Sequence, residues 1–291
     1  MLAVVLLAVP NLSEGRSDAV IERVATAFAP ATVLDRHSDS DHNRTVLWLA
    51  AAAQDELAGA LASGARAAAE SIDLTAQNGV HPRVGALDVA PVVYRDEAER
   101  GPATATALTA AALIGELGVP VFLYGELATD PSRAERSNLR RGGPERLGER
   151  IASGELHPDY GPSEIHPTAG ATLVTARPPL VAFNVDLDSK DLALATTIAS
   201  ELRESSGGLP GVRALGLWLE ARGRVQVSMN VHDYNAAPLP AIVARIAARA
   251  PIAEAELVGL APAAALADFP AGIPLRNRRT IEDALDRSQS S

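Results

Sequence analysis

Hydrophobic positions in the first half of the chain follow a helical spacing in alanine-rich stretches, with short apolar runs between them. Apolar residues three or four apart form one face of a helix, whereas a short apolar run bounded by turn residues is typical of a buried strand. Ser17 and Asp18 can cap the first helix, and Pro30 ends it. The predicted elements are strand 1–10, a helix with apolar residues from 20 to 28, strands 32–35 and 43–50, a helix with apolar residues from 57 to 72, strand 84–94, helix 103–117 and strand 121–126.

Residues 130–163 depart from this pattern, because they are rich in Arg, Gly, Pro and Glu and have few periodic apolar residues. A short helix is expected at residues 146–152, and the rest is expected to be a surface excursion. Such a stretch is usually a solvated linker, and the alternative is a functional loop.

The second half gives a clearer pattern, with Arg222 and Gly223 at the turn of a predicted hairpin. Its elements are strand 180–187, helix 190–204, strands 213–221 and 224–232, helix 242–248 and strand 254–259. This order is the split βαβ or ferredoxin-like pattern, and the first half repeats it with an extra helix and strand. We therefore predict an α+β fold, a tandem of two ferredoxin-like α/β sandwich subdomains, residues 1–177 and 178–291, with a substrate cleft between them.

The amino-acid composition excludes several kinds of catalytic site and binding partner. The chain has 291 residues, of which 47% are hydrophobic and 21% charged, so it is expected to be globular, with roughly two domains. It has no cysteine, which excludes disulfides, thiolate metal ligands and a cysteine nucleophile. The net charge of −10 argues against a nucleic-acid or anionic-membrane partner. The apolar start has no basic residues and is too short to span a bilayer, so a cytoplasmic location is expected.

The stretch at residues 78–91 joins a predicted helix to a predicted strand and contains His81, Arg83 and Asp88. Side chains at such boundaries can be aimed at a ligand by the elements on either side. Gly79 and Gly85 flank the histidine and would allow another backbone or a substrate to approach closely. A structural histidine in a loop is the alternative to a catalytic one.

Residues 224–232 alternate strictly: the valines and Met229 share one face, and Gln226, Ser228 and Asn230 share the other. The polar face is either the solvated side of a sheet or the lining of a ligand site. Asn11 and Asn184, each in or next to an apolar run, fit the second interpretation.

The loop predicted at residues 37–42 holds two histidines and two aspartates, but they are too close in sequence to surround one ion. We therefore expect no metal site and a solvated turn. No phosphate-binding loop, dinucleotide fingerprint or nucleophile elbow is present in the sequence.

Several motifs resemble, in order, those of the glutamate formiminotransferase family. They are VPNLSEG at residues 9–15, DHNRT at 41–45, HPRVGALDV at 81–89, LYGE at 123–126, PDYGP at 158–162, AFN at 182–184, QVS at 226–228 and ELVGL at 256–260. The resemblance implies a tandem ferredoxin-like fold, often dimeric, without the cyclodeaminase domain that follows in some members. The residues just before the histidine, often basic in the family, are Gln77 and Asn78 here.

The resemblance also implies an activity: transfer of the formimino group from N-formimino-L-glutamate to tetrahydrofolate in histidine breakdown and one-carbon metabolism. The family's catalytic histidine matches His81. Its folate-contacting loop matches residues 161–170. These are Gly161, Pro162, Ser163, Glu164, Ile165, His166, Pro167, Thr168, Ala169 and Gly170.

Such a transfer needs a base for the folate N5 proton and an acid for the departing glutamate nitrogen, and one imidazole can serve as both. Asp35 or Asp39 could stabilise a cationic amidinium or orient the histidine. The carboxylates of glutamate or folate could be bound by an arginine, for which the candidates are Arg44, Arg83 and Arg177. Formyl transfer between 5-formyltetrahydrofolate and glutamate, and folate binding without transfer, are the alternatives.

Overall fold

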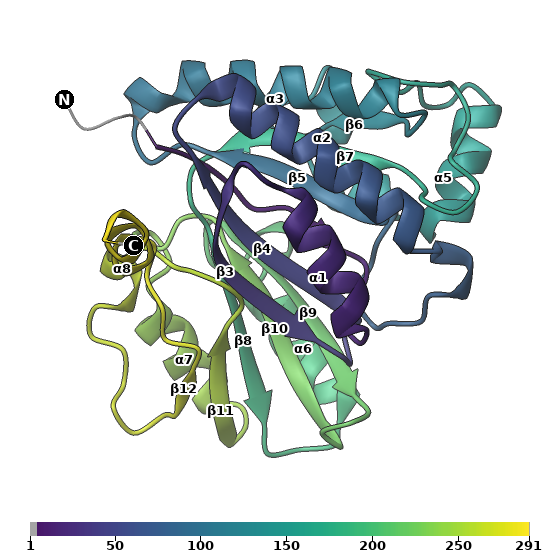
Figure 1. Ribbon diagram of the computed structural model, residues 1–291. Coiled ribbons are helices and arrows are strands. Elements are labelled where there is room, and N and C mark those ends of the chain that lie inside the picture. Colours follow the sequence, from purple (N-terminus) through teal and green to yellow (C-terminus); the bar gives the residue numbers. More distant parts are fainter. Residues whose placement is uncertain (1–4, 291) are drawn as a thin grey trace. The chain divides into compact units, whose positions relative to one another are not determined.

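The computed structural model describes residues 5–290, and the chain divides into two compact units (Figure 1). Unit 1 comprises Met1–Pro178 and unit 2 comprises Pro179–Ser291. Each unit has its own β-sheet and its own hydrophobic core. Within residues 5–290, no helix is both long and apolar enough to cross a membrane.

A mixed sheet forms the centre of unit 1. Its strands are β1 (Leu6–Ala8), β2 (Asn11–Leu12), β3 (Thr32–Asp39), β4 (Arg44–Ala51), β5 (Leu87–Val93), β6 (Val121–Leu123) and β7 (Thr172–Arg177). β3 lies beside β4, and both β1 and β2 pair with β4 on one side and with β5 on the other, all antiparallel. β5, β7 and β6 continue the sheet as parallel neighbours.

Helices cover both faces of the unit 1 sheet. α1 (Asp18–Ala27), α2 (Gln54–Ser71) and α3 (Glu97–Glu116) lie over one face (Figure 1). The short α4 (Arg136–Arg140) and α5 (Gly143–Ala152) lie against the other. Side chains of β6 alternate between these two faces. Val121 and Leu123 belong to the core under α1–α3. Phe122 packs on the other face, with Leu139 of α4 and Leu147 of α5. Strand alternation therefore supplies two apolar layers.

Unit 2 is a second sheet with two helices in its core. Its elements are β8 (Val181–Leu187), α6 (Leu192–Leu202), β9 (Val212–Leu219), β10 (Arg224–Val231), α7 (Leu239–Ala247), β11 (Ile252–Leu257), β12 (Leu275–Arg276) and α8 (Ile281–Gln289). The strand order is β12-β11-β8-β10-β9, antiparallel except for the β11–β12 pair. Short 3₁₀ turns lie at Leu74–Ala76, Gly125–Leu127 and Pro131–Arg133 in unit 1, and at Glu204–Ser206 and Ala263–Leu266 in unit 2.

The α+β class and the tandem of two α/β subdomains are confirmed, and the ferredoxin-like label stays a prediction. The side-chain cap expected at Ser17 is present, since its hydroxyl accepts from Val20 N at 3.4 Å. α3 begins at Glu97 rather than at residue 103, because Asp96 accepts from the amides of Ala98 and Glu99 and so starts the helix ahead of Pro102.

One expected loop was wrong, and several elements were not predicted. Residues 37–39 are strand rather than loop, because β3 continues its pairing with β4 as far as Asp39 and Arg44. Residues 172–177 form β7, which no pattern indicated, and α4 and α8 were also missed. The predicted strand at 1–10 is observed at Leu6–Ala8, while residues 1–4 lie outside the described part of the chain.

Candidate active site

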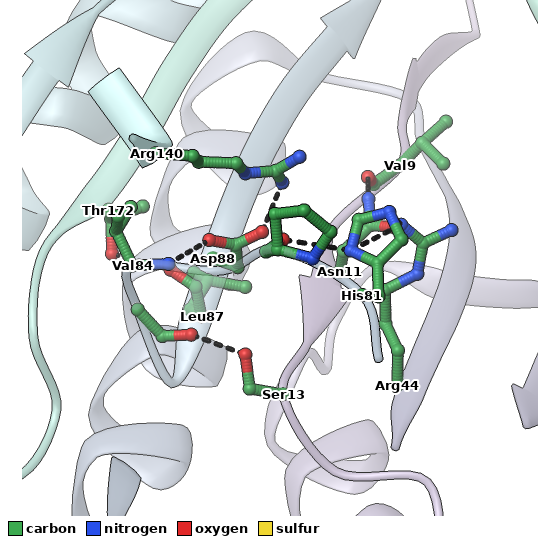
Figure 2. A network of polar contacts seen from close by, with 12 residues as sticks. Val9, Asn11, Ser13, Arg44, His81, Val84, Leu87, Asp88, Arg140 and Thr172 are labelled. Carbon is green, nitrogen blue, oxygen red and sulfur yellow. Dashed lines mark hydrogen bonds and ion pairs between the residues drawn. The ribbon is translucent and has the colours of Figure 1, made fainter. Parts of the chain in front are cut away.

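His81 lies between the 3₁₀ turn at Leu74–Ala76 and β5, and both of its ring nitrogens have partners in unit 1 (Figure 2). Arg44 Nη1 donates to Nε2 at 2.7 Å, and Nδ1 is 2.8 Å from the carbonyl oxygen of Pro82. Because a guanidinium only donates, Nε2 must accept, so Nδ1 carries the proton and donates to Pro82. The imidazole is therefore neutral, with its basic nitrogen facing Arg44.

The electrostatic surroundings of His81 keep the ring neutral. Its pKa is lowered well below 6.5, first by burial and then by the positive charges of Arg44 and Arg140, with smaller effects of His42 and Arg136. The His42 ring is stacked against it, with 5.9 Å between the ring centroids. As a residue His81 keeps partial solvent exposure, but the neighbouring charges all act in the same direction as burial. A neutral imidazole at physiological pH is in the form that accepts a proton.

The loop that holds His81 is tied to the β3–β4 turn by Asn43. Its side-chain amide donates to the Asn78 carbonyl at 3.0 Å and to the Gln77 side chain, and its oxygen accepts from Gly15 N at 2.9 Å. Gln77 in turn donates to Glu14 at 3.0 Å. Side chains from three separate segments therefore fix the position from which His81 projects.

The glycines on either side of His81 are required by close backbone contacts, as the sequence indicated. A Cβ at Gly79 would lie 2.5 Å from the His42 carbonyl oxygen, and one at Gly85 would lie 1.9 Å from that of Ala171. A side chain at either position would push the loop away from its neighbours.

Asp88, in β5, forms a buried ion pair with Arg140 of α4 (Figure 2). The carboxylate is 1% exposed and also accepts from Val84 N at 2.8 Å. Pairing and hydrogen bonding compensate for the cost of burying this charge. The ion pair holds α4 against the sheet, and the hydrogen bond from Val84 N holds the C-terminal end of the His81 loop against β5.

Residues 161–170 run next to the His81 loop at their C-terminal end. Ala86 N donates to the Ala169 carbonyl at 2.9 Å, and Gly170 forms an antiparallel bridge with Gly85. Gly170 has φ +70°, and its Cα faces the Val84 carbonyl, which a Cβ would approach to 2.1 Å. The C-terminal end of the expected folate loop therefore lies against residues 84–86, at the end of the His81 loop.

Four other predicted contacts lie in unit 1. Asn11 is buried, and its amide donates to the Val9 carbonyl at 3.0 Å (Figure 2). Asp39 accepts from His42 N at 2.8 Å, and its charge acts on Arg44. Asp35 is buried on β3. Arg83 donates to the carbonyls of residues 77 and 79, at 2.5 and 3.4 Å, so it closes the His81 loop.

The remaining predicted contacts belong to unit 2. Asn184 of β8 pairs with Ser228 of β10, and Asn230 follows on the same strand. Gln226 donates to Asp186 at 2.7 Å and is fully buried. This amide satisfies a buried carboxylate, which is a structural task within unit 2.

The polar stretch at residues 37–42 is not the solvated turn that was expected. His37, Asp39, Asp41 and His42 are each less than a tenth exposed. They are enclosed because β3 continues to Asp39 and the following turn packs under the His81 loop, where Val80 N donates to the Asp41 carbonyl at 3.3 Å. Among residues 5–290, no group of three or more His, Cys, Asp or Glu side chains is arranged to hold a metal ion.

Sequence reasoning missed Arg136, Arg140 and Tyr124 as site residues. The two arginines come from the stretch expected to be a surface excursion, where four-residue spacing around the buried Leu139 was the available signal. The Arg136 guanidinium lies 5.8 Å from the centroid of the Tyr124 ring. Tyr124 lies in the LYGE motif at residues 123–126, but the sequence indicated no role for it.

Comparison with known proteins covers both units. Residues 5–177 match the model of the formiminotransferase domain, N-terminal subdomain, and residues 182–275 match the model of the formiminotransferase domain. A glutamate formimidoyltransferase of Streptococcus pyogenes serotype M1 is 40% identical over 276 residues, which is 92% of each chain. One of Thermoplasma acidophilum is 37% identical over 271 residues, 89% of each chain. A formimidoyltransferase-cyclodeaminase of Sus scrofa is 38% identical over 279 residues, which is 89% of this chain and 50% of the relative.

Proposed function

The chain belongs to the formiminotransferase family, and we propose that it is an enzyme that transfers the formimino group of N-formimino-L-glutamate to tetrahydrofolate. The products are 5-formiminotetrahydrofolate and L-glutamate, which places the reaction in one-carbon metabolism. The observation that carries the proposal at the level of residues is the His81 imidazole, neutral and with its basic Nε2 among arginines.

His81 acts as the general acid and base in this proposal. The folate N5 attacks the amidine carbon, a bond forms between them, and Nε2 takes the N5 proton once Arg44 has released its hydrogen bond to that nitrogen. The bond from that carbon to the glutamate nitrogen then breaks, and the same proton passes to the departing amine. Protons and electron pairs balance without a covalent enzyme intermediate, which suits a chain without cysteine.

The remaining assignments are proposals of the same kind. We assign folate binding to residues 161–170, supported by their hydrogen bonds to the His81 loop. Residues 1–177 and 178–291 are proposed as the two formiminotransferase subdomains. A cytoplasmic location and a homodimer stay predictions.

One assay separates this reaction from its alternatives. Tetrahydrofolate is incubated with N-formimino-L-glutamate or with N-formyl-L-glutamate, and release of L-glutamate is measured. We expect release from the formimino donor. Release only from the formyl donor would establish formyl transfer, and saturable folate binding without release from either donor would leave a binding protein.

The pH dependence of the reaction follows from the lowered pKa of His81. Below its pKa the ring is protonated and no longer a base, so kcat/KM should stay level as the pH falls from neutral through 6.5 and decline only at lower pH. In Arg44→Gln one positive charge is lost, so the pKa of His81 rises and the acidic limb moves to higher pH. Burial, the largest cause, remains, so the limb should stay below pH 6.5.

The measurement is the pH profile of kcat/KM for the wild type, Arg44→Gln and Arg36→Gln. Arg36 is an exposed arginine of β3 that pairs with Glu22, and its loss should leave the limb unchanged. An unmoved limb in Arg44→Gln would show that Arg44 does not set the protonation of His81.

A further inference from the structure

A strip of positive charge leads away from His81 in unit 1. It is formed by four arginines, which we call the arginine strip: Arg44, Arg140, Arg136 and Arg177. Arg44 and Arg140 act on His81 itself. The charge of Arg136 acts on Arg44, Arg140 and Arg177, so Arg136 lies near the other three members of the strip.

The strip has more positive charge than its own carboxylates balance. Within residues 5–290, Asp88 is the carboxylate that forms an ion pair with a member of the strip, and that pair is with Arg140. Burial and the neighbouring arginines lower the pKa of Arg44 to about 9, and burial lowers the pKa of Arg140 and of Arg177 to about 10. Guanidiniums in such surroundings are stabilised by a bound anion.

Polar atoms along the strip also lack partners. Among the described residues, the Nε atoms of Arg140 and Arg177 are buried without a hydrogen bond. Tyr124 is 6% exposed, and Arg136 lies over its ring. Buried polar groups are nearly always satisfied in native proteins, so these atoms point to a ligand that supplies acceptors.

We propose that the arginine strip binds the two carboxylates of the glutamyl donor, an inference that rests on the proposed function. In an N-formimino amino acid the reacting carbon is joined through one nitrogen to the carbon that bears the α-carboxylate. Bond lengths along that path add up to about 4 Å. A donor whose amidine lies at His81 therefore has its α-carboxylate within reach of Arg44 and Arg140, and its γ-carboxylate extends towards Arg136.

Tetrahydrofolate also ends in a glutamyl dicarboxylate, but a p-aminobenzoyl group separates that tail from N5. The carboxylates of folate are therefore far from the reacting atoms, whereas the strip begins at His81. The geometry favours the donor as the occupant, and the folate tail is the outcome against which it is tested.

The test is binding of an unreactive donor analogue, N-acetyl-L-glutamate, measured by calorimetry in the full chain. Arg136→Gln is the main variant, because Arg136 is half-buried and has no carboxylate partner among the described residues, so its loss should leave the fold intact. Arg141→Gln is the matched control: Arg141 is exposed, follows α4 directly and bonds to Asn138. N-acetyl-L-glutamine, which lacks the γ-carboxylate, probes the second charge.

We expect Arg136→Gln to weaken binding of N-acetyl-L-glutamate about tenfold, as the loss of one charge-assisted hydrogen bond implies. Binding of N-acetyl-L-glutamine should change little, and Arg141→Gln should bind both as the wild type does. The preference for folate over pteroate, which has no glutamyl tail, should be the same in all three proteins.

Two results would overturn the proposal. A loss of the folate preference in Arg136→Gln, with N-acetyl-L-glutamate binding unchanged, would assign the strip to the folate tail. Absence of N-acetyl-L-glutamate binding in the wild type, or equal binding in wild type and Arg136→Gln, would show that the strip is not a site for donor carboxylates. Neither measurement needs turnover, so failure of the transfer assay remains a separate result.

Discussion

His81→Ala should lose formimino transfer by a factor of about 10² to 10⁴ in kcat, the usual contribution of one general acid–base group. The loss should fall on kcat, because the ring moves a proton in the transition state and does not hold the donor carboxylates. The substitution should leave the fold intact. The ring is partly exposed, and its hydrogen bonds are to Arg44 and to the adjacent Pro82 carbonyl.

The experiment measures glutamate release and folate binding for His81→Ala beside His157→Ala. His157 is an exposed histidine of unit 1 on which the proposal places no role, so its variant should match the wild type. Added imidazole can enter the space left by the deleted ring and should restore part of the rate to His81→Ala alone. Near-normal turnover of that variant without imidazole would exclude His81 as the acid–base group.

The sequence allowed the close backbone contacts on either side of His81 and the cap of the first helix to be predicted, because short-range signals record them. Gly79 and Gly85 stand where backbones touch, and Pro30, Ser17 and the apolar spacing mark element ends. These are local constraints, and each shows in a few adjacent residues.

The arginine strip could be predicted only in part. Arg44 and Arg177 were candidates for binding carboxylates, but Arg136 and Arg140 were not, because the members come from β4, α4 and β7, which are distant in sequence. Arg136 and Arg140 resemble the charged residues of any surface helix until α4 is seen packed on the sheet. β7 was missed because the preceding loop is rich in Pro and Gly, which are typical of irregular structure. The strand is defined by its parallel pairing with β5 and β6. Pairing across such distances is a tertiary property.

Polar runs were misjudged for a related reason. Composition suggests a solvated turn at residues 37–42, and in most proteins a charge-rich segment is exposed. Here β3 continues to Asp39, and the turn lies beneath the His81 loop, so its charges are buried. A polar segment that is buried in this way has partners to satisfy, which is common near a functional site.

Arg140→Gln should destabilise unit 1 by about 3–5 kcal/mol, because it leaves the Asp88 carboxylate buried without its cation. Asp88→Asn should cost less: the amide oxygen can still accept from Val84 N, and no buried anion is left. The double variant should recover part of the loss in Arg140→Gln, since it removes the uncompensated charge. A strictly additive double variant would show that the two side chains do not stabilise each other.

Urea unfolding can be followed separately in each unit, because the two tryptophans, Trp48 and Trp218, lie one in each. In a Trp218→Phe background, the emission of Trp48, which is 3% exposed in β4, reports unit 1 alone. Arg36→Gln serves as the control, since its exposed pair with Glu22 should contribute about 0–1 kcal/mol. If Arg140→Gln lowers the unfolding free energy no more than this control does, the Asp88–Arg140 pair does not fasten α4 to the sheet, and the position of the arginine strip must depend on the apolar contacts of Leu139 and Leu147 instead.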